Sequence, residues 1–193
     1  RERLDYELEI IHAMGYDCLR WEIGMGFQEK LVVGGDPSPG AKRQRAWTDQ
    51  HHGAIASWED FERYPWPNAE HVDLFALEYL SSHLPDGMGF ITCHAGGPFE
   101  HISQIMSIET LCIKLLEDPA LVQAVSDKVG ECMEAYYRRL LGLDRLAALF
   151  QGDDMGFRTG TLIGPDHLRQ YSLPWHRRFA DMAHAHGIPY FLH

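Results

Sequence analysis

The sequence predicts an α/β fold, a (β/α)8 TIM barrel of which these 193 residues cover roughly the amino-terminal half to two-thirds. Helical patterns alternate with short apolar stretches, and each apolar stretch ends on polar residues, as in residues 142–154 and 187–193. In β/α enzymes the carboxyl ends of parallel strands face the ligand, so such endings gather at one mouth. About four strands alternating with helices make roughly half of an eight-stranded barrel of about 250 residues.

We expect residues 1–193 to be a single barrel domain that is incomplete at its carboxyl end. The sequence stops on residues 188–192, an apolar stretch that would be a buried parallel strand without a covering helix. A complete, small doubly wound sheet is the competing fold. The long loop after the first strand and the abrupt end both favour the barrel.

The amino-terminal part predicts a helix, a strand and a long loop. Apolar residues at helical spacing over residues 4–14, followed by a glycine, indicate a helix with its C-terminal cap. A strand then reaches about residue 23. Residues 24–69 predict a long loop excursion with a short helix at 58–63, because they contain the turn-rich stretch 34–40 and a Tyr-Pro-Trp-Pro sequence.

The rest of the chain predicts alternating helices and strands. Apolar residues recur at helical spacing from Pro119 almost to Gly142, and Asp118 is placed as the N-cap of this helix. Pro174 predicts a break or a restart in the last helical region. The other expected elements are helices at 73–83, 101–117 and 164–186, and strands at 88–93, 146–151 and 188–192.

The composition excludes some classes of function. The chain has 17 basic and 28 acidic residues, a formal net charge of −11. Nucleic-acid affinity depends largely on Lys and Arg that neutralise phosphates, so we expect no nucleic-acid partner. No stretch approaches the roughly 20 apolar residues of a membrane helix, and the start lacks the apolar core of a secretory signal, so we expect no membrane partner.

The cysteines indicate the compartment. Cys18, Cys93, Cys112 and Cys132 are widely spaced and form no CxxC pair. Free Cys packs as a small apolar residue, so buried free thiols in a reducing cytoplasm are expected. The sequence therefore predicts a cytoplasmic protein.

Four predicted strands end on residues that can carry chemistry. The candidates are Glu22, His94, Asp153 with Asp154, and His193. Adjacent side chains of an extended segment point to opposite sides, so at most one of the two aspartates faces the barrel axis. The alternative is that the aspartate pair caps the next turn, and that a histidine at a strand end bonds to its neighbour. We expect these side chains to converge on one cavity rim.

Small residues separate His94 from the following helix. Gly96 and Gly97 would let a ligand approach the backbone, and the amides at a helix start favour an anionic group. Turn geometry explains the same glycines equally well.

Several motifs together resemble the uroporphyrinogen decarboxylase superfamily, with a fairly specific match over about residues 88–193. This superfamily includes cofactor-free porphyrinogen decarboxylases and zinc-dependent methyltransferases that move methyl groups between corrinoids and thiols or related acceptors. The resemblance implies a (β/α)8 barrel with its site at the strand carboxyl ends. The motifs are Gly97-Pro98-Phe99-Glu100, Asp118-Pro119, Asp153-Asp154-Met155-Gly156, Gly164-Pro165-Asp166-His167-Leu168, Pro174 and His186-Gly187-Ile188-Pro189-Tyr190-Phe191-Leu192-His193.

Departures from the decarboxylase pattern argue against a porphyrinogen substrate. The arginine-bearing Met-Arg-Gln-Ala-Gly-Arg segment of the decarboxylases is absent from these residues. An ungapped alignment leaves Gly24 at the position of their essential Asp, with Glu22 two residues earlier. Gln104 stands where they have a Tyr, and Asp153 where they have a Ser.

The methyltransferase branch resembles this chain better through His193. In that branch a His begins a His-x-Cys pattern that holds zinc, so the resemblance implies zinc at His193 with its other ligands beyond residue 193. Zinc lowers the pKa of a bound thiol and so supplies a thiolate nucleophile. Asp153, Asp154 and Glu22 are the expected catalytic residues.

The remaining expectations concern ligands, partners and alternatives. Substrate contacts are expected from His94, Gly97, Phe99, Gln104 and Met155. The expected partners are a small-molecule or tetrapyrrole substrate and a corrinoid protein, with a homodimer left open. A decarboxylase of a porphyrinogen or a related carboxylated substrate, which would need no cofactor, is the alternative. A non-catalytic tetrapyrrole- or corrinoid-binding protein is the third possibility.

Overall fold

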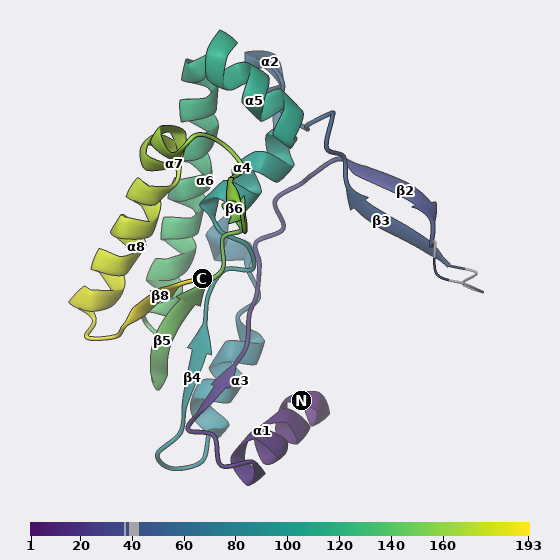
Figure 1. Ribbon diagram of the computed structural model, residues 1–193. Coiled ribbons are helices and arrows are strands. Elements are labelled where there is room, and N and C mark those ends of the chain that lie inside the picture. The colour runs from purple at the N-terminus through teal and green to yellow at the C-terminus, as the bar shows by residue number, and fades with distance from the viewer. Residues whose placement is uncertain (37, 39–42) are drawn as a thin grey trace.

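Four parallel strands form the main sheet of the computed structural model, which describes residues 1–36, 38 and 43–193 (Figure 1). The strands are β1 (Cys18–Arg20), β4 (Gly89–Thr92), β5 (Leu146–Gln151) and β8 (Tyr190–Leu192). They lie in the order β1-β4-β5-β8, which is their order along the chain. A doubly wound sheet reverses its strand order at a switch point, whereas a barrel does not. The sheet is therefore an arc of a (β/α) barrel.

Helices connect these strands, and two antiparallel strand pairs lie outside the main sheet. The helices are α1 (Glu2–Ala13), α2 (Trp58–Arg63), the 3-10 helix η1 (Ala69–His71), α3 (Phe75–His83), α4 (Pro98–Met106), α5 (Ile108–Glu117), α6 (Pro119–Leu140), α7 (Pro165–Tyr171) and α8 (Leu173–Ala185). The outer pairs are β2 (Leu31–Gly35) with β3 (Gln44–Thr48), and β6 (Gly156–Phe157) with β7 (Gly160–Thr161). Within the described residues, no helix has the length and apolar character needed to cross a membrane.

The long helix α6 contributes many of the buried residues of the core. It begins as its sequence predicts, because the Asp118 carboxylate accepts a hydrogen bond from the Leu121 amide at 3.2 Å and Pro119 occupies the first turn. Figure 1 shows α6 and α8 on the same side of the sheet. They approach closely at Gly130, where an added Cβ would lie 2.0 Å from the Trp175 ring. Alanine at Gly130 would therefore displace the Trp175 ring or α8 itself.

The prediction of a loop over residues 24–69 is wrong in part. The short helix at 58–63 is confirmed, but the excursion also contains the β2–β3 hairpin and η1. Both strands of the hairpin are largely exposed on both faces, so the apolar alternation that marks a half-buried strand is missing. Of the predicted turn-rich stretch, Pro37 and residues 39–40 lie outside the described residues.

The single helix predicted over residues 101–117 is two helices. Ser107 separates α4 from α5 with φ of 62°, a left-handed conformation that is uncommon outside glycine. Its side chain accepts a hydrogen bond from the Thr110 amide at 3.2 Å and so caps α5. The apolar spacing continues across the break, which contains no Gly or Pro, and this is why the pattern indicated one helix.

The cysteines confirm the prediction of free thiols but not of uniform burial. All four are free, and Cys93 and Cys132 are buried. Cys112 is exposed on α5, which corrects the expectation for that residue.

Candidate active site

The structure brings the four predicted strand ends to one edge of the sheet. Ile23 forms a parallel bridge to His94, which places Glu22 and His94 side by side at the ends of the neighbouring strands β1 and β4. The His193 amide donates to the Gln151 carbonyl at 2.9 Å, so His193 lies beside the end of β5. The side chains nevertheless divide between two faces of the sheet. One face is covered by helices, and we call the other the open face, defined by Arg20, Glu22, Cys93, Phe150, Phe191 and His193.

On the helix-covered face, the Asp153 carboxylate is buried and accepts hydrogen bonds from several groups of the protein. One oxygen accepts from the Glu100 amide at 2.9 Å. The other accepts from the Phe99 amide at 3.1 Å and the Ser172 hydroxyl at 3.2 Å, and lies 2.7 Å from His176 Nε2. The anionic group expected at the start of α4 is therefore an aspartate of the chain itself.

Gly97 is explained by the same contact. A Cβ at this position would lie 2.3 Å from Asp153, so the backbone of Gly97 approaches a neighbouring strand end, and its role as a substrate contact stays a prediction. Glu100 completes the helix start, because its carboxylate accepts from the Gly97 amide at 3.0 Å. Burial raises the pKa of Glu100, with the nearby Asp153 charge as a smaller cause.

His176 and Tyr190 extend this network, and sequence reasoning missed both. His176 Nδ1 lies 2.8 Å from the Tyr190 hydroxyl, so the imidazole links Asp153 to β8. Burial raises the pKa of Tyr190 above its ordinary value, with Asp153 as a further cause. Sequence pattern could have marked His176, because it lies three residues before the core residue Phe179 on α8.

His94 also points into the helix layer. Its Nε2 lies 2.8 Å from the Met25 amide, which donates to it, so the neutral ring carries its proton on Nδ1. Nδ1 faces the Gly96 carbonyl at 3.2 Å and His101 Nε2 at 3.1 Å. Burial lowers the pKa of His94 to about 4, and burial together with His94 lowers that of His101 to about 3. Both rings are neutral at pH 7.

The open face holds Glu22 and an arginine that sequence reasoning missed. Arg20 forms an ion pair with Glu22, and its guanidinium lies 4.6 Å from the centre of the Phe150 ring. The side chains of Arg20 and Glu22 are 52% and 33% exposed. Residues two apart on a strand share a face, which is the signal that could have found Arg20 from the prediction of Glu22.

Cys93, Phe191 and His193 complete the open face. Burial raises the pKa of Cys93 to about 12, with the neighbouring Glu22 as a second cause, so its thiol stays protonated at neutral pH. The Phe191 and His193 rings lie 6.0 and 6.1 Å from the Phe150 ring, and both residues are exposed.

The other predicted site residues lie off this face. Asp154 is exposed, so the two aspartates point to different environments, as the extended geometry predicts. Phe99 is buried in the core, and Gln104 is half-buried on α4. Met155 is half-buried against the core cluster. Their roles as substrate contacts stay predictions.

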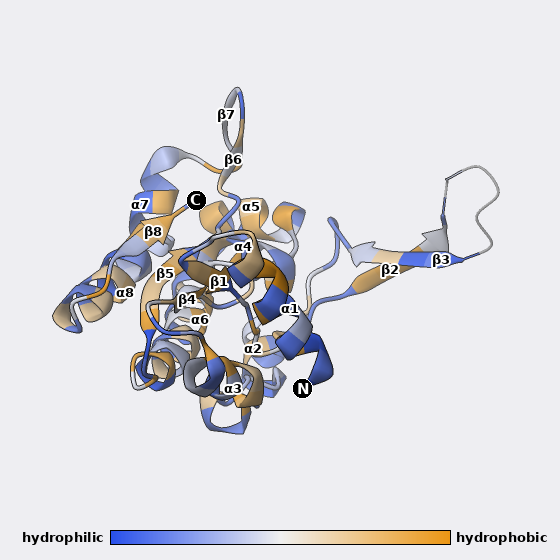
Figure 2. Ribbon diagram, turned by 90° about the horizontal axis from the view of Figure 1, so that it is seen from below, coloured by the Kyte–Doolittle hydropathy of each residue, from blue (hydrophilic) through white to orange (hydrophobic). Residues whose placement is uncertain are grey.

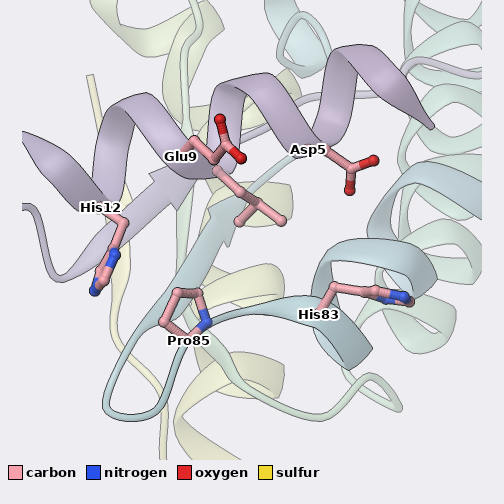
Figure 3. Close-up of a pocket in the computed structure, with 6 residues that line it drawn as sticks. Asp5, Glu9, His12, His83 and Pro85 are labelled. Atoms are coloured by element: carbon pink, nitrogen blue, oxygen red, sulfur yellow. The ribbon is translucent and has the colours of Figure 1, made fainter.

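Two cavities lie at opposite ends of the sheet. One, of about 410 Å³, is lined by Arg20, Trp21 and Glu22 of β1 and the following loop and by Arg3 and Glu7 of α1. The other, of about 330 Å³, lies between α1 and the end of α3 at the amino ends of the strands (Figure 3). Barrel enzymes place chemistry at the carboxyl ends, so we assign the candidate site to the open face at Glu22.

The described residues do not provide a complete set of zinc ligands. Over residues 1–36, 38 and 43–193, no three His, Cys, Asp or Glu side chains are grouped to hold a metal ion. His193 is the only ligand that the resemblance assigned within this chain, and structural zinc sites need about four. No chemical step is therefore derived through zinc.

Comparisons with known proteins place the chain in a family. A family model described as uroporphyrinogen decarboxylase (URO-D) matches residues 50–193. A methyltransferase from Methanosarcina mazei has a similar solved structure, with a TM-score of 0.63 and 15% identity. The match covers 98% of this chain and 55% of that one, so this chain spans about half the length of its structural neighbour. No curated protein matches the sequence significantly.

Proposed function

The chain belongs to the uroporphyrinogen decarboxylase family, and from this premise we propose that it is a barrel enzyme that transfers a methyl group to a small acceptor such as a thiol. The observation that carries the proposal is the open face, where Glu22 and His193 are both presented at the carboxyl edge of the sheet. The fold shared with a methyltransferase over 98% of this chain supports it. A corrinoid protein is the proposed methyl donor.

We assign the roles on the open face as follows. Glu22 accepts the proton of the acceptor thiol as general base. Arg20, ion-paired with Glu22, holds that carboxylate in place. A corrinoid on a partner protein would supply the methyl group: the thiolate sulfur would bond to the methyl carbon, and the electron pair of the bond that the methyl group leaves would stay with the corrinoid.

Asp153 has a different role in this proposal. It touches no reacting atom, because its oxygens are engaged by α4, Ser172 and His176. It is a positioning residue that fixes the loop between β4 and α4 beside the site. Asp154 and His193 stay proposed contributors, and zinc content of the full-length protein is the direct measurement for His193.

The test uses the full-length protein with methylcobalamin and a thiol under anaerobic conditions. We expect the cobalamin spectrum to shift as the methyl group leaves, and mass spectrometry to find the S-methyl product. Glu22→Gln should lower the rate by about 10²-fold or more, while Glu70→Gln, which makes the same change at an exposed carboxylate of η1, serves as the matched control. Full activity in Glu22→Gln would overturn the assignment.

A second candidate is decarboxylation of a porphyrinogen or another carboxylated substrate. Arg20 in the open-face cavity favours it, because guanidinium binds carboxylates in a bidentate geometry. Release of carbon dioxide from such a substrate without added metal, together with no methyl transfer, would decide for this candidate.

A further inference from the structure

Residues 23–28, which we call the strap, link the candidate base Glu22 to the β2–β3 hairpin. Figures 1 and 2 show this hairpin projecting away from the body of the protein, so the strap leads from the site to the projection. The Ile23 carbonyl accepts hydrogen bonds from the Tyr136 hydroxyl at 2.9 Å and from the Ala95 amide at 3.3 Å. The backbone is therefore held directly after Glu22.

His94 holds the next part of the strap. The Met25 amide donates a hydrogen bond to His94 Nε2 at 2.8 Å, and Nδ1 of the same ring faces the Gly96 carbonyl at 3.2 Å. Nε2 accepts a hydrogen bond only while it carries no proton, so this arrangement requires the neutral ring. The imidazole thus ties the strap to the loop between β4 and α4.

The surroundings of His94 enclose it within the helix layer. The residue is 1% exposed, and its ring centre lies 5.3 Å from that of Tyr136 and 5.7 Å from that of Phe27 in the strap. His101 Nε2 lies 3.1 Å from its Nδ1. A side chain enclosed in this way can act on the open face through the strap, which carries the effect to Glu22.

The position of Glu22 depends on the backbone that carries it. Its ion pair with Arg20 is partly exposed, and exposed ion pairs contribute little to holding a side chain in one place. A general base must lie within about 2.6–3.2 Å of the atom whose proton it accepts, and a displacement of about 1 Å can cost about 10²-fold in rate. Contacts that fix the backbone beside Glu22 therefore support the proposed chemistry.

We propose that His94 is a positioning residue, which keeps Glu22 in place on the open face by holding the strap through the Met25 amide. The inference rests on the proposed function, in which Glu22 is the general base. Tyr136 has a smaller share of the same role, through the Ile23 carbonyl.

Two substitutions separate the two polar contacts of the His94 ring. In His94→Gln the side-chain oxygen reaches the position of Nε2 and can still accept from Met25, whereas in His94→Asn the polar atoms reach only the position of Nδ1, beside Gly96. In the methyl-transfer assay with the full-length protein, His94→Asn should lower kcat by about tenfold or more and leave KM within about twofold. His94→Gln should restore kcat to within about threefold of the parent.

Tyr136→Phe tests the second contact of the strap. It removes only the hydroxyl that donates to Ile23 and should lower kcat by about two- to fivefold without a change in KM. This variant keeps the proposal falsifiable if both His94 variants fail to fold.

Hydrogen–deuterium exchange supplies a readout that needs no substrate. Peptides that cover the strap should exchange about fivefold faster in His94→Asn than in the parent, and at close to the parent rate in His94→Gln. If the parent protein transferred no methyl group, the proposed function would fail and the role of Glu22 with it. The exchange rates would still decide separately whether His94 holds the strap.

Two control variants exclude general effects. His184→Asn makes the same change at an exposed residue of α8 and should alter neither readout. Val129→Ala truncates a fully buried residue of α6 about two turns before Tyr136, so it should lower stability while kcat stays at the parent value.

Four results would overturn the proposal. His94→Asn and His94→Gln could lose the same share of kcat, which would show that the contact with Met25 is not what matters. His94→Asn could raise KM and leave kcat unchanged, as the loss of a substrate contact would. Val129→Ala could lower kcat as much as His94→Asn does. The strap could exchange at the parent rate in His94→Asn although circular dichroism shows that variant folded.

Discussion

The two faces of the sheet at its carboxyl edge differ in what their side chains contact. On the helix-covered face, Asp153 and His94 are buried, and their polar atoms are engaged by backbone amides and by other side chains. On the open face, Glu22 forms an ion pair with Arg20, and both side chains remain partly exposed. Polar residues at the ends of parallel strands therefore identify the edge of the sheet where a site can lie. The face on which each side chain lies then determines whether it stabilises the fold or is available for chemistry.

The largest expected effect is the loss of stability on removing the Asp153 carboxylate. Asp153→Ala leaves two helix amides and the His176 imidazole without their acceptor in a buried site, which should cost about 3–5 kcal/mol of unfolding free energy. Urea unfolding of the full-length protein measures it. Asp154→Ala, an exposed neighbour, should change stability by less than about 0.5 kcal/mol. Equal costs for both would show that the buried contacts of Asp153 add no stability.

Acid should destabilise the helix-covered face next most strongly. His94 and His101 have folded-state pKa values of about 4 and about 3, below the unfolded value of about 6.5. The unfolded chain therefore binds these protons first, so stability is complete above about pH 6.5 and falls as the pH drops from there toward about 4.

His101→Gln should remove roughly 2 kcal/mol of the stability difference between pH 7 and about pH 4.5. Unfolding curves of the variant and the parent at both values measure this difference. An unchanged difference would mean that His101 is not a buried neutral group.

Crowding at Gly97 should have a smaller effect. Gly97→Ala places a Cβ 2.3 Å from Asp153 and should cost about 1–2 kcal/mol through displacement of the start of α4. Gly152→Ala is the control, because an added Cβ there meets nothing within 4 Å. Thermal unfolding of both variants compares them, and a neutral Gly97→Ala would show that this contact is loose.

The smallest effect on stability is expected on the open face. Glu22→Gln should change the unfolding free energy by less than about 0.5 kcal/mol, since its ion pair with Arg20 is partly exposed. The same variant is expected to lose activity. A loss of activity without a loss of stability would distinguish a residue of the open face from one of the helix-covered face. A cost above about 2 kcal/mol would place Glu22 with the scaffold.

Sequence pattern predicted the fold better than the site. The bounds of β5 and the capped start of α6 follow from local rules, that is, an apolar run and an Asp-Pro start. The positions of Glu22, His94, Asp153 and His193 at one edge also follow from the strand-end rule. The face of the sheet on which each of these side chains lies could not be predicted from the sequence. It depends on the alternation of side chains along each strand and on which face the helices cover.

Contacts between distant segments explain what the pattern missed. His176 and Tyr190 bind each other and Asp153 only after α8 packs on the sheet. The exposed hairpin lacks the burial alternation by which strands are found, and Ser107 breaks a helix through its own backbone conformation.

The registers of the main sheet determine when it can be assembled during synthesis. Cys18 of β1 pairs with Gly89, Phe90 of β4 pairs with Leu146, and Leu149 of β5 pairs with Tyr190. Each pairing therefore waits for a strand that the ribosome delivers much later, and such nonlocal contacts form slowly. While β1 waits, its apolar residues stay accessible to other nascent chains, so the emerging protein is expected to depend on chaperones until β4 has left the exit tunnel.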